Sequence, residues 1–235
     1  MGRSDERPES QDERWRAKQA HYQDPAVVAS YDAERFAGVG NRRSTARKWR
    51  ALRRGLGREF EHVRSVLDVP CGNGRFTELL LGEGKRVVNA DRSRPMLLAA
   101  REKAGRAKAG GGRAEHVECD AARLPFADAS FDLVLSVRFF LHVPKDLRAG
   151  FLREMGRVSR RWVVVDVRHR YCLTTVGKRL RARIAGRQPP SLRSSLAEID
   201  ADVAAAGLEL VKRTWLSPGF SEKMLLFCAR PAAGW

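Results

Sequence analysis

The sequence predicts an α/β fold with an open, doubly wound parallel sheet, and two observations lead to this prediction. Short apolar runs of strand length recur along the chain, and three of them stop at or next to an acid: Asp68, Asp91 and Asp120. The first run is followed at once by a glycine turn, Gly72 and Gly74, and then by a helix start. Because parallel strands present their carboxyl ends at one edge of such a sheet, we expect these acids to line a ligand crevice.

The glycine turn is typical of a loop that begins a nucleotide-type cofactor site. Gly72 and Gly74 allow a tight turn and leave no Cβ between the backbone and a ligand. A dinucleotide motif G-x-G-x-x-G would require glycine where this chain has Thr77, so the sequence argues against a pyrophosphate. Asp91 lies roughly 20 residues past the glycines and is placed to accept both hydroxyls of a ribose. These residues predict an adenosine-containing cofactor without phosphates.

Three segments, in this order, resemble the motifs of the class I S-adenosylmethionine-dependent methyltransferases. They are DVPCGNGRF at 68–76, VVNAD at 87–91 and ECDAARLPFADASFDLVLS at 118–136. The D-x-x-x-L-P-F form of the third motif is most similar to the branch that includes the ubiquinone and menaquinone biosynthesis methyltransferases. The first motif of the family usually reads D/E-x-G-x-G-x-G, and this chain departs from it with Pro70 in place of the first glycine.

The resemblance implies S-adenosyl-L-methionine as the cofactor and a role for each matching residue. Asp68, Gly72 and Gly74 would lie along the methionine half. Asp91 would hold the ribose diol and Met96 would pack near the adenine, while the acid of the third motif and the alanine after it would read the adenine amino edge. The complete set of candidate cofactor-binding residues is Tyr31, Asp68, Pro70, Gly72, Gly74, Asp91, Arg92, Met96, Asp120, Ala121, Ser136 and Val137.

Each of these residues also has a purely structural interpretation. Asp68 alone fits a helix cap or a turn, and the glycines alone fit an ordinary loop. Asp91 is also placed to cap the turn that follows it, and Asp120 to act as a simple turn aspartate. Met96 belongs to the core in the structural interpretation. The order of the motifs, rather than any single residue, favours the cofactor site.

In this family the loop at 137–144 lies beside the transferable methyl group. His142 is the best candidate for a general base, because the ordinary pKa of histidine is near neutral; a structural histidine is the alternative. Arg138 is a candidate for binding an acidic group of the substrate or for pairing with Asp166. The four cysteines have no metal-type spacing, so no metal site is expected. Whether oxygen, nitrogen or carbon is methylated stays open.

The expected organisation has three parts. A disordered polar tail at 1–20 precedes an N-terminal helical cap at 21–60, where Tyr31 either closes over the cofactor or packs against the sheet. A class I methyltransferase domain follows at 61–235, with a Rossmann-like seven-stranded sheet and helices on both faces, as the resemblance also implies. A basic helical insertion after the fifth strand, at 168–197, is interpreted as a substrate lid.

The formal net charge of +17 is concentrated in two stretches. Residues 41–60 hold eight basic residues and one acid, and residues 168–197 hold eight basic residues and no acid. Such charge attracts acidic partners over about 8–10 Å at physiological salt. The basic amphipathic insertion suits an anionic membrane surface or an anionic ligand, and the alternative is a lid whose arginines are simply solvated.

The predicted function is methyl transfer from S-adenosyl-L-methionine to a small, anionic or lipid-like acceptor, with peripheral contact with an anionic membrane as a further expectation. One alternative is an RNA methyltransferase, although the sequence has no separate RNA-binding module and no Asn/Asp-Pro-Pro-Tyr motif. Another is a non-catalytic cofactor-binding adaptor. No apolar run approaches the length of a membrane span and the N-terminus lacks a secretory signal, so a cytoplasmic location is expected.

Overall fold

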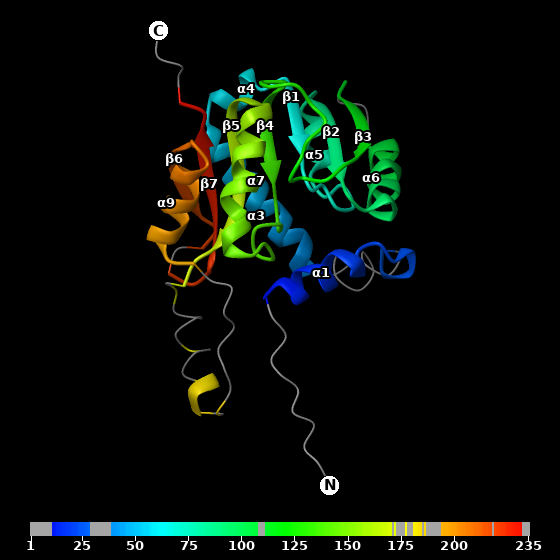
Figure 1. Ribbon diagram of the computed structural model, residues 1–235. Coiled ribbons are helices and arrows are strands. Elements are labelled where there is room, and N and C mark those ends of the chain that lie inside the picture. Colours follow the sequence, from blue (N-terminus) through cyan, green and yellow to red (C-terminus); the bar gives the residue numbers. More distant parts are fainter. Residues whose placement is uncertain are drawn as a thin grey trace.

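A seven-stranded sheet forms the centre of the protein in the computed structural model (Figure 1). The structure describes residues 11–28, 39–107, 111–170, 172, 177, 181–184, 186, 194–217 and 219–231. The strands are β1 Ser65–Asp68, β2 Arg86–Asp91, β3 Arg113–Glu118, β4 Phe131–Ser136, β5 Ser159–Arg168, β6 Glu209–Trp215 and β7 Lys223–Ala229. The helices are α1 Gln11–His21, α3 Val39–Leu56, α4 Glu59–His62, α5 Thr77–Gly82, α6 Arg94–Arg106, α7 Lys145–Val158 and α9 Leu196–Ala205.

The strands lie in the order β3-β2-β1-β4-β5-β7-β6. The five strands from β3 to β5 pair in parallel, whereas β7 runs antiparallel to both β5 and β6. The direction of winding changes between β1 and β4, so the carboxyl ends of these two strands form the switch point at which open α/β sheets bind ligands. The predicted seven-stranded α/β fold is confirmed.

Two apolar clusters cover the two faces of the sheet. On one face, α7 and α9 contribute side chains such as Met155 and Val203. On the other face, α3, α4 and α5 contribute Leu52, Phe60 and Leu80. The strands between them are buried on both sides, as expected for a parallel sheet covered by helices. Because Leu52 and Phe60 belong to this core, α3 and α4 are integral to the same folded unit as the sheet.

The prediction for the N-terminus is wrong in one respect. Residues 1–20 are expected from their composition to be disordered, but residues 11–21 form α1. Trp15, Lys18, Gln19 and Tyr22 recur at helical intervals and are half-buried, because this face of α1 lies against the carboxyl ends of the strands (Figure 1). The tertiary contact, rather than the composition of the helix, is what orders it.

The predicted helical cap at 21–60 is described in two parts, residues 21–28 and 39–60. Helix α3 begins at Val39, and it packs against β6 and β7 rather than over the ligand edge. Tyr31, the candidate cofactor residue of this segment, lies outside the described residues, as does most of the predicted lid at 168–197. In the part of the chain that is described, no helix combines the length and the apolar character needed to cross a membrane.

Gly55 provides a test of how α3 packs. A Cβ built on Gly55 would lie only 1.9 Å from the ring Cζ of Phe227 on β7, whereas a Cβ on Gly150 of α7 would meet nothing within 4 Å. We expect Gly55→Ala to lower the free energy of unfolding by about 1–3 kcal/mol through overpacking. Gly150→Ala, the control, should raise it by about 0.5–1 kcal/mol. Urea unfolding measures both, and equal effects of the two substitutions would contradict the packing of α3 on β7.

Candidate functional site

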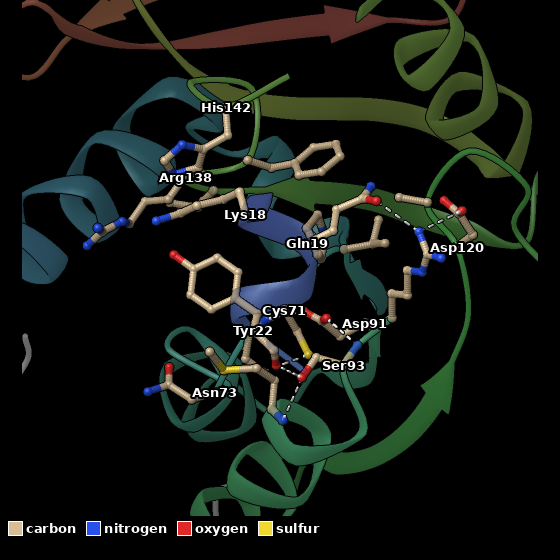
Figure 2. A pocket seen from close by; sticks show the side chains of 18 of the residues that line it. Lys18, Gln19, Tyr22, Cys71, Asn73, Asp91, Ser93, Asp120, Arg138 and His142 are labelled. Carbon is tan, nitrogen blue, oxygen red and sulfur yellow. Dashed lines mark hydrogen bonds and ion pairs between the residues drawn. The ribbon is translucent and has the colours of Figure 1, made fainter. Parts of the chain in front are cut away.

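A cavity lies at the carboxyl edge of the sheet, beside the switch point between β1 and β4 (Figure 2). Its walls come from the glycine turn after β1, the start of α6, the loop after β3, the loop after β4, and α1. Among the predicted site residues, those that line it are Pro70, Gly72, Asp91, Arg92, Met96, Asp120, Ala121, Val137, Arg138 and His142. Three other predicted residues, Asp68, Gly74 and Ser136, are buried next to the cavity wall without lining it.

The two glycines of the turn have different tasks. Both adopt a left-handed conformation, with φ of +54° at Gly72 and +72° at Gly74. A Cβ at Gly74 would lie 2.9 Å from Ala100 and from the hydroxyl of Thr77, so α6 packs directly on this residue. A Cβ at Gly72 would meet nothing within 4 Å, and Gly72 lines the cavity. Gly74 is therefore required by packing, whereas Gly72 leaves room beside the turn for a ligand.

Asp91 is held rigidly at the end of β2. Its Oδ2 accepts a hydrogen bond from the amide of Gly72 at 2.8 Å, and its Oδ1 accepts one from the amide of Ser93 at 2.9 Å. The N-cap of α6 is Ser93, whose hydroxyl accepts from the amide of Met96 at 3.2 Å, so Asp91 supports the cap without being it. Each carboxylate oxygen accepts more than one hydrogen bond. Asp91 therefore keeps acceptor capacity for the hydroxyls of a ribose.

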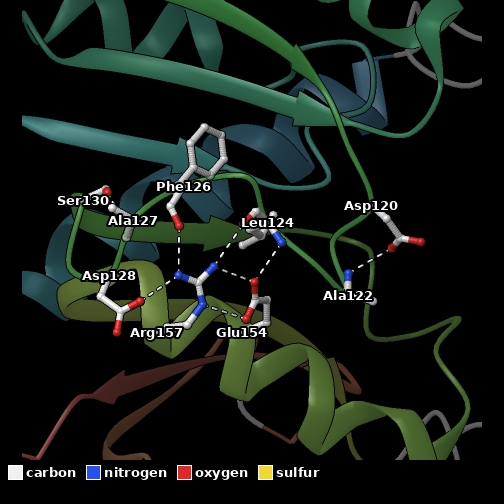
Figure 3. A network of polar contacts seen from close by, with 9 residues as sticks. All are labelled: Asp120, Ala122, Leu124, Phe126, Ala127, Asp128, Ser130, Glu154 and Arg157. Carbon is white, nitrogen blue, oxygen red and sulfur yellow. Dashed lines mark hydrogen bonds and ion pairs between the residues drawn. The ribbon is translucent and has the colours of Figure 1, made fainter.

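The loop after β3 carries Asp120 and is fixed to α7. Figure 3 shows Arg157 of α7 donating hydrogen bonds to the carbonyls of Leu124 at 3.0 Å and Phe126 at 2.8 Å, while it also pairs with Glu154. Asp120 itself accepts from the amide of Ala122 at 2.9 Å, which is the contact of a turn aspartate. The side chain of Asp120 is nevertheless exposed to the cavity. Both interpretations of Asp120 are therefore compatible with its geometry.

Helix α1 forms a wall of the cavity that the sequence interpretation missed. At its centre, the ring of Trp15 lies 5.7 Å from that of Phe139 and 6.2 Å from that of Phe151, measured between centroids. The helical spacing of Trp15, Lys18, Gln19 and Tyr22 was the available signal. The cavity-lining residues that were not predicted are Trp15, Lys18, Gln19, Tyr22, Gln23, Val69, Cys71, Asn73, Arg75, Ser93, Cys119, Phe139 and Phe151.

The end of α1 is bound to the turn after β2, which carries Arg92 and Ser93. Gln19 accepts a hydrogen bond from the guanidinium of Arg92 at 3.1 Å, and the same Arg92 lies 3.9 Å from the carboxylate of Asp120. Gln23 donates to the carbonyl of Arg92 at 3.1 Å, and the hydroxyl of Ser93 donates to the carbonyl of Tyr22. The wall and the turn after β2 are thus joined by several polar contacts.

Two buried polar atoms at the base of the site have no hydrogen-bond partner among the described residues: Oδ2 of Asp68 and Oγ of Ser136. Burial, together with the charge of Asp91, raises the pKa of Asp68 to about 8. An isolated buried carboxyl group is costly in its charged form unless a positive group compensates it. Since S-adenosyl-L-methionine carries a sulfonium and an ammonium group, this unsatisfied acid fits the expected cofactor, and Asp68 and Asp91 are the residues that would hold it.

Arg138 and His142 come from the loop after β4. Arg138 has a left-handed backbone, with φ of 69°, and its amide donates to the carboxylate of Asp166, which also forms a buried ion pair with Lys48. The expected Arg138–Asp166 contact therefore occurs through the main chain. Burial, with help from the charges of Lys18 and Arg138, lowers the pKa of His142 to about 4. His142 is thus neutral at pH 7. Its pKa, however, lies well below the near-neutral value for which it was chosen as the candidate base.

The raised pKa of Asp68 predicts a pH-dependent stability of the ligand-free protein. The pKa of Asp68 in the folded protein, about 8, lies above the ordinary value of 3.8. The contribution of Asp68 to the free energy of unfolding is therefore fully present below pH 3.8 and is lost as the pH rises toward 8. We expect Asp68→Asn to remove this loss and to raise the unfolding free energy by roughly 1–3 kcal/mol at pH 8. Urea unfolding across this pH range measures it, with Asp128→Asn as the exposed-acid control. Parallel pH profiles for the wild type and Asp68→Asn would contradict it.

The comparisons with known proteins point to methyltransferases. Residues 67–162 match the model of a family described as a methyltransferase domain. The chain is 35% identical over 159 residues to the methyltransferase GfsG of Streptomyces halstedii, covering 65% of this chain and 55% of that protein. It is 41% identical over 95 residues to a demethylmenaquinone methyltransferase of Clavibacter sepedonicus, covering 40% of this chain and 36% of that protein. The chain thus spans about half of the first relative and about a third of the second.

The fold has close counterparts among solved structures. Magnesium protoporphyrin IX methyltransferase (ChlM) from Synechocystis PCC 6803, solved with bound SAH, gives a TM-score of 0.70 at 16% identity and covers 92% of this chain and 99% of that chain. The resemblance stated from the motifs, including that to the menaquinone branch, is confirmed. Residues 67–162 of this chain are therefore a methyltransferase domain, and the fold is that of solved methyltransferases that bind SAM or SAH.

Proposed function

We propose that this protein transfers the methyl group of S-adenosyl-L-methionine to a small-molecule acceptor. The observation that carries the proposal is the shared cavity, which joins Asp91 at the end of β2 to the aromatic side chains of Trp15 and Phe139. One part of the cavity is lined by residues that stand at the cofactor motifs of the family. The other part has apolar walls beside these residues. The family match supports methyl transfer, and the walls support an acceptor small enough to enter beneath α1.

The chemistry requires little from the protein beyond positioning. Bound S-adenosyl-L-methionine supplies an electrophilic methyl group that a nucleophile attacks in line. Helix α1 would exclude water from the reacting atoms, since Trp15 packs against Phe139 and Phe151 across the cavity. Asp91 would fix the ribose, and His142, neutral at pH 7, would accept a proton from an acceptor hydroxyl or amine.

The relatives support a small acceptor. The names of two similar proteins refer to demethylmenaquinone and to magnesium protoporphyrin IX, neither of which is a macromolecule. The aromatic residues that line the cavity suit an acceptor with a flat or apolar body, in line with the lipid-like class predicted from the sequence. An anionic character and a contact with anionic membrane belong to the same proposal.

The basic stretch at 41–60 offers less positive charge to a binding partner than its composition indicates. In residues 41–60, Lys48 is paired with Asp166 inside the protein and Arg53 is paired with Glu83 at 2.7 Å. Arg50 and Arg54 are exposed on α3, which packs on the face of the sheet opposite to α7 and α9. An RNA methyltransferase and a non-catalytic adaptor are the competing functions. Incubation with radiolabelled cofactor and separate small-molecule, lipid and RNA pools distinguishes them: label in RNA, or no transfer to any pool, would contradict the proposal.

The cofactor assignment predicts a selective binding profile. We expect S-adenosyl-L-methionine and its demethylated product to bind in the micromolar range and NAD not to bind, because Thr77 replaces the third glycine of a dinucleotide motif. Asp91→Ala should weaken cofactor binding by about 1.5–3 kcal/mol, the contribution of a hydrogen-bonded charged group. Calorimetry measures both, with Asp200→Ala, a surface acid paired with Arg213, as the control. Binding of NAD, or unchanged affinity in Asp91→Ala, would contradict the assignment.

The role of His142 is tested by turnover. If His142 is the base, His142→Ala should lower kcat by roughly 10²–10⁴ and leave cofactor affinity nearly unchanged. Since the pKa of His142 in the ligand-free protein lies at about 4, protonation of His142 should not reduce kcat/KM until the pH falls below about 5. His62→Ala, an exposed histidine of α4, is the control. A loss smaller than tenfold with a hydroxyl or amine acceptor would assign His142 a structural role.

A further inference from the structure

The two acids that line the cavity, Asp91 and Asp120, lie on one side of it, where Asp120 also has Arg92 beside it. Figure 2 shows Lys18, Arg138 and His142 on one side of the cavity, and Asp91 and Asp120 on the other. The side with the carboxylates is the one that the cofactor motifs assign to adenosine. We call the side formed by Lys18, Arg138 and His142 the cationic end; Lys18 and Arg138 carry its positive charge, whereas His142 is neutral at pH 7. Lys18 comes from α1, and Arg138 and His142 come from the loop after β4.

Acids close to the cationic end have cations of their own. Asp166 forms the buried ion pair with Lys48, and Glu222 lies 3.3 Å from Arg168. Lys223 adds a further positive charge nearby, and its pKa is lowered by burial and by the charges of Arg168 and Arg138. Among the described residues, the basic groups that act electrostatically on His142 are Lys18, Arg138 and Arg168, against Asp166 as the one acid. The charge that the described residues place at the cationic end is therefore positive on balance.

Aromatic side chains surround the same end. The ammonium of Lys18 lies 5.0 Å from the ring centroid of Tyr22, and Phe139 follows Arg138 directly in the loop after β4. Phe139 in turn packs edge-on against Phe151 at 5.0 Å. Lys18 and Arg138 are both half-buried beside this apolar surface. Electrostatic attraction is stronger in such surroundings than at an open surface.

We propose that the cationic end binds an anionic oxygen group of the methyl acceptor, a carboxylate or a phosphate, through Lys18 and Arg138. The aromatic side chains beside it hold the apolar body of the acceptor. The inference rests on the proposed function, since it assigns the anion to the molecule that is methylated. It also narrows that function to acceptors with an anionic group next to a flat apolar part.

Binding of such a group has a consequence for His142. Burial and the neighbouring cations hold the pKa of His142 low, at about 4. An anion placed between Lys18 and Arg138 offsets two of these cations, and a nearby negative charge favours the protonated imidazole. The pKa of His142 therefore rises when the acceptor binds. His142 thus becomes a stronger base only while an acceptor is bound at the cationic end.

The test uses three probes of one shape: 2-naphthoate, 2-naphthyl phosphate and the neutral 2-naphthamide. Their binding to the full chain is measured by calorimetry, with and without saturating S-adenosylhomocysteine. We expect at least one anion to bind tenfold or more tightly than the amide, and the tighter of the two anions distinguishes carboxylate from phosphate. Lys18→Gln and Arg138→Gln should each reduce this preference several-fold. Lys212→Gln, which removes an exposed charge on β6, should leave it unchanged.

An NMR titration of His142 provides a second measurement, which does not depend on turnover. Its pKa should rise by at least one unit when the preferred anion is bound. Equal affinity for the three probes, no binding of either anion at millimolar concentration, or full preference retained in both cavity variants would overturn the inference. Failure of the proposed function has a different result: the protein would not bind S-adenosylhomocysteine, whereas the preference for anions would still be measured in its absence.

Discussion

The carboxylate of Asp91 is the contact on which the ligand edge depends. It accepts amide hydrogen bonds from Gly72 and Ser93, and so it ties the turn after β1 to the start of α6 at the end of β2. Burial raises the pKa of Asp91, and these amides act in the opposite direction by stabilising the carboxylate. One buried acid thereby fixes three chain segments around the space where the ribose would lie.

The wall formed by α1 is built on the same segment. The amide of Ser93 donates to the carboxylate of Asp91, and the hydroxyl of Ser93 donates to the carbonyl of Tyr22. The neighbouring Arg92 donates to the side chain of Gln19. At the other end, Trp15 packs against Phe139 and Phe151. Helix α1 therefore bridges the turn after β2 and the loop after β4. A displacement of either loop would alter the contacts of α1, because the helix packs against both of them.

The charge of the protein is organised by its fold more than by its composition. The stretch at 41–60 reads as one basic block, yet its Lys48 is buried against Asp166, which lies 118 residues away and which also holds the backbone of Arg138. By contrast, Lys18 belongs to an N-terminal segment of mixed charge and contributes to the cationic side of the cavity. Local composition reports charge along the chain, whereas binding depends on the charges that converge in space.

The sequence by itself determined the sheet and the cofactor edge. The fourth strand at 131–136 and the helix at 145–158 follow local patterns of apolar residues, and Gly72 and Asp91 lie at fixed distances from strand ends, so neighbouring residues carry the information. Only the tertiary structure decided that residues 11–21 form a helix over the site and that Lys18 lies near Arg138. A short polar helix is unstable alone, and it is ordered by contacts with distant residues that no local pattern contains.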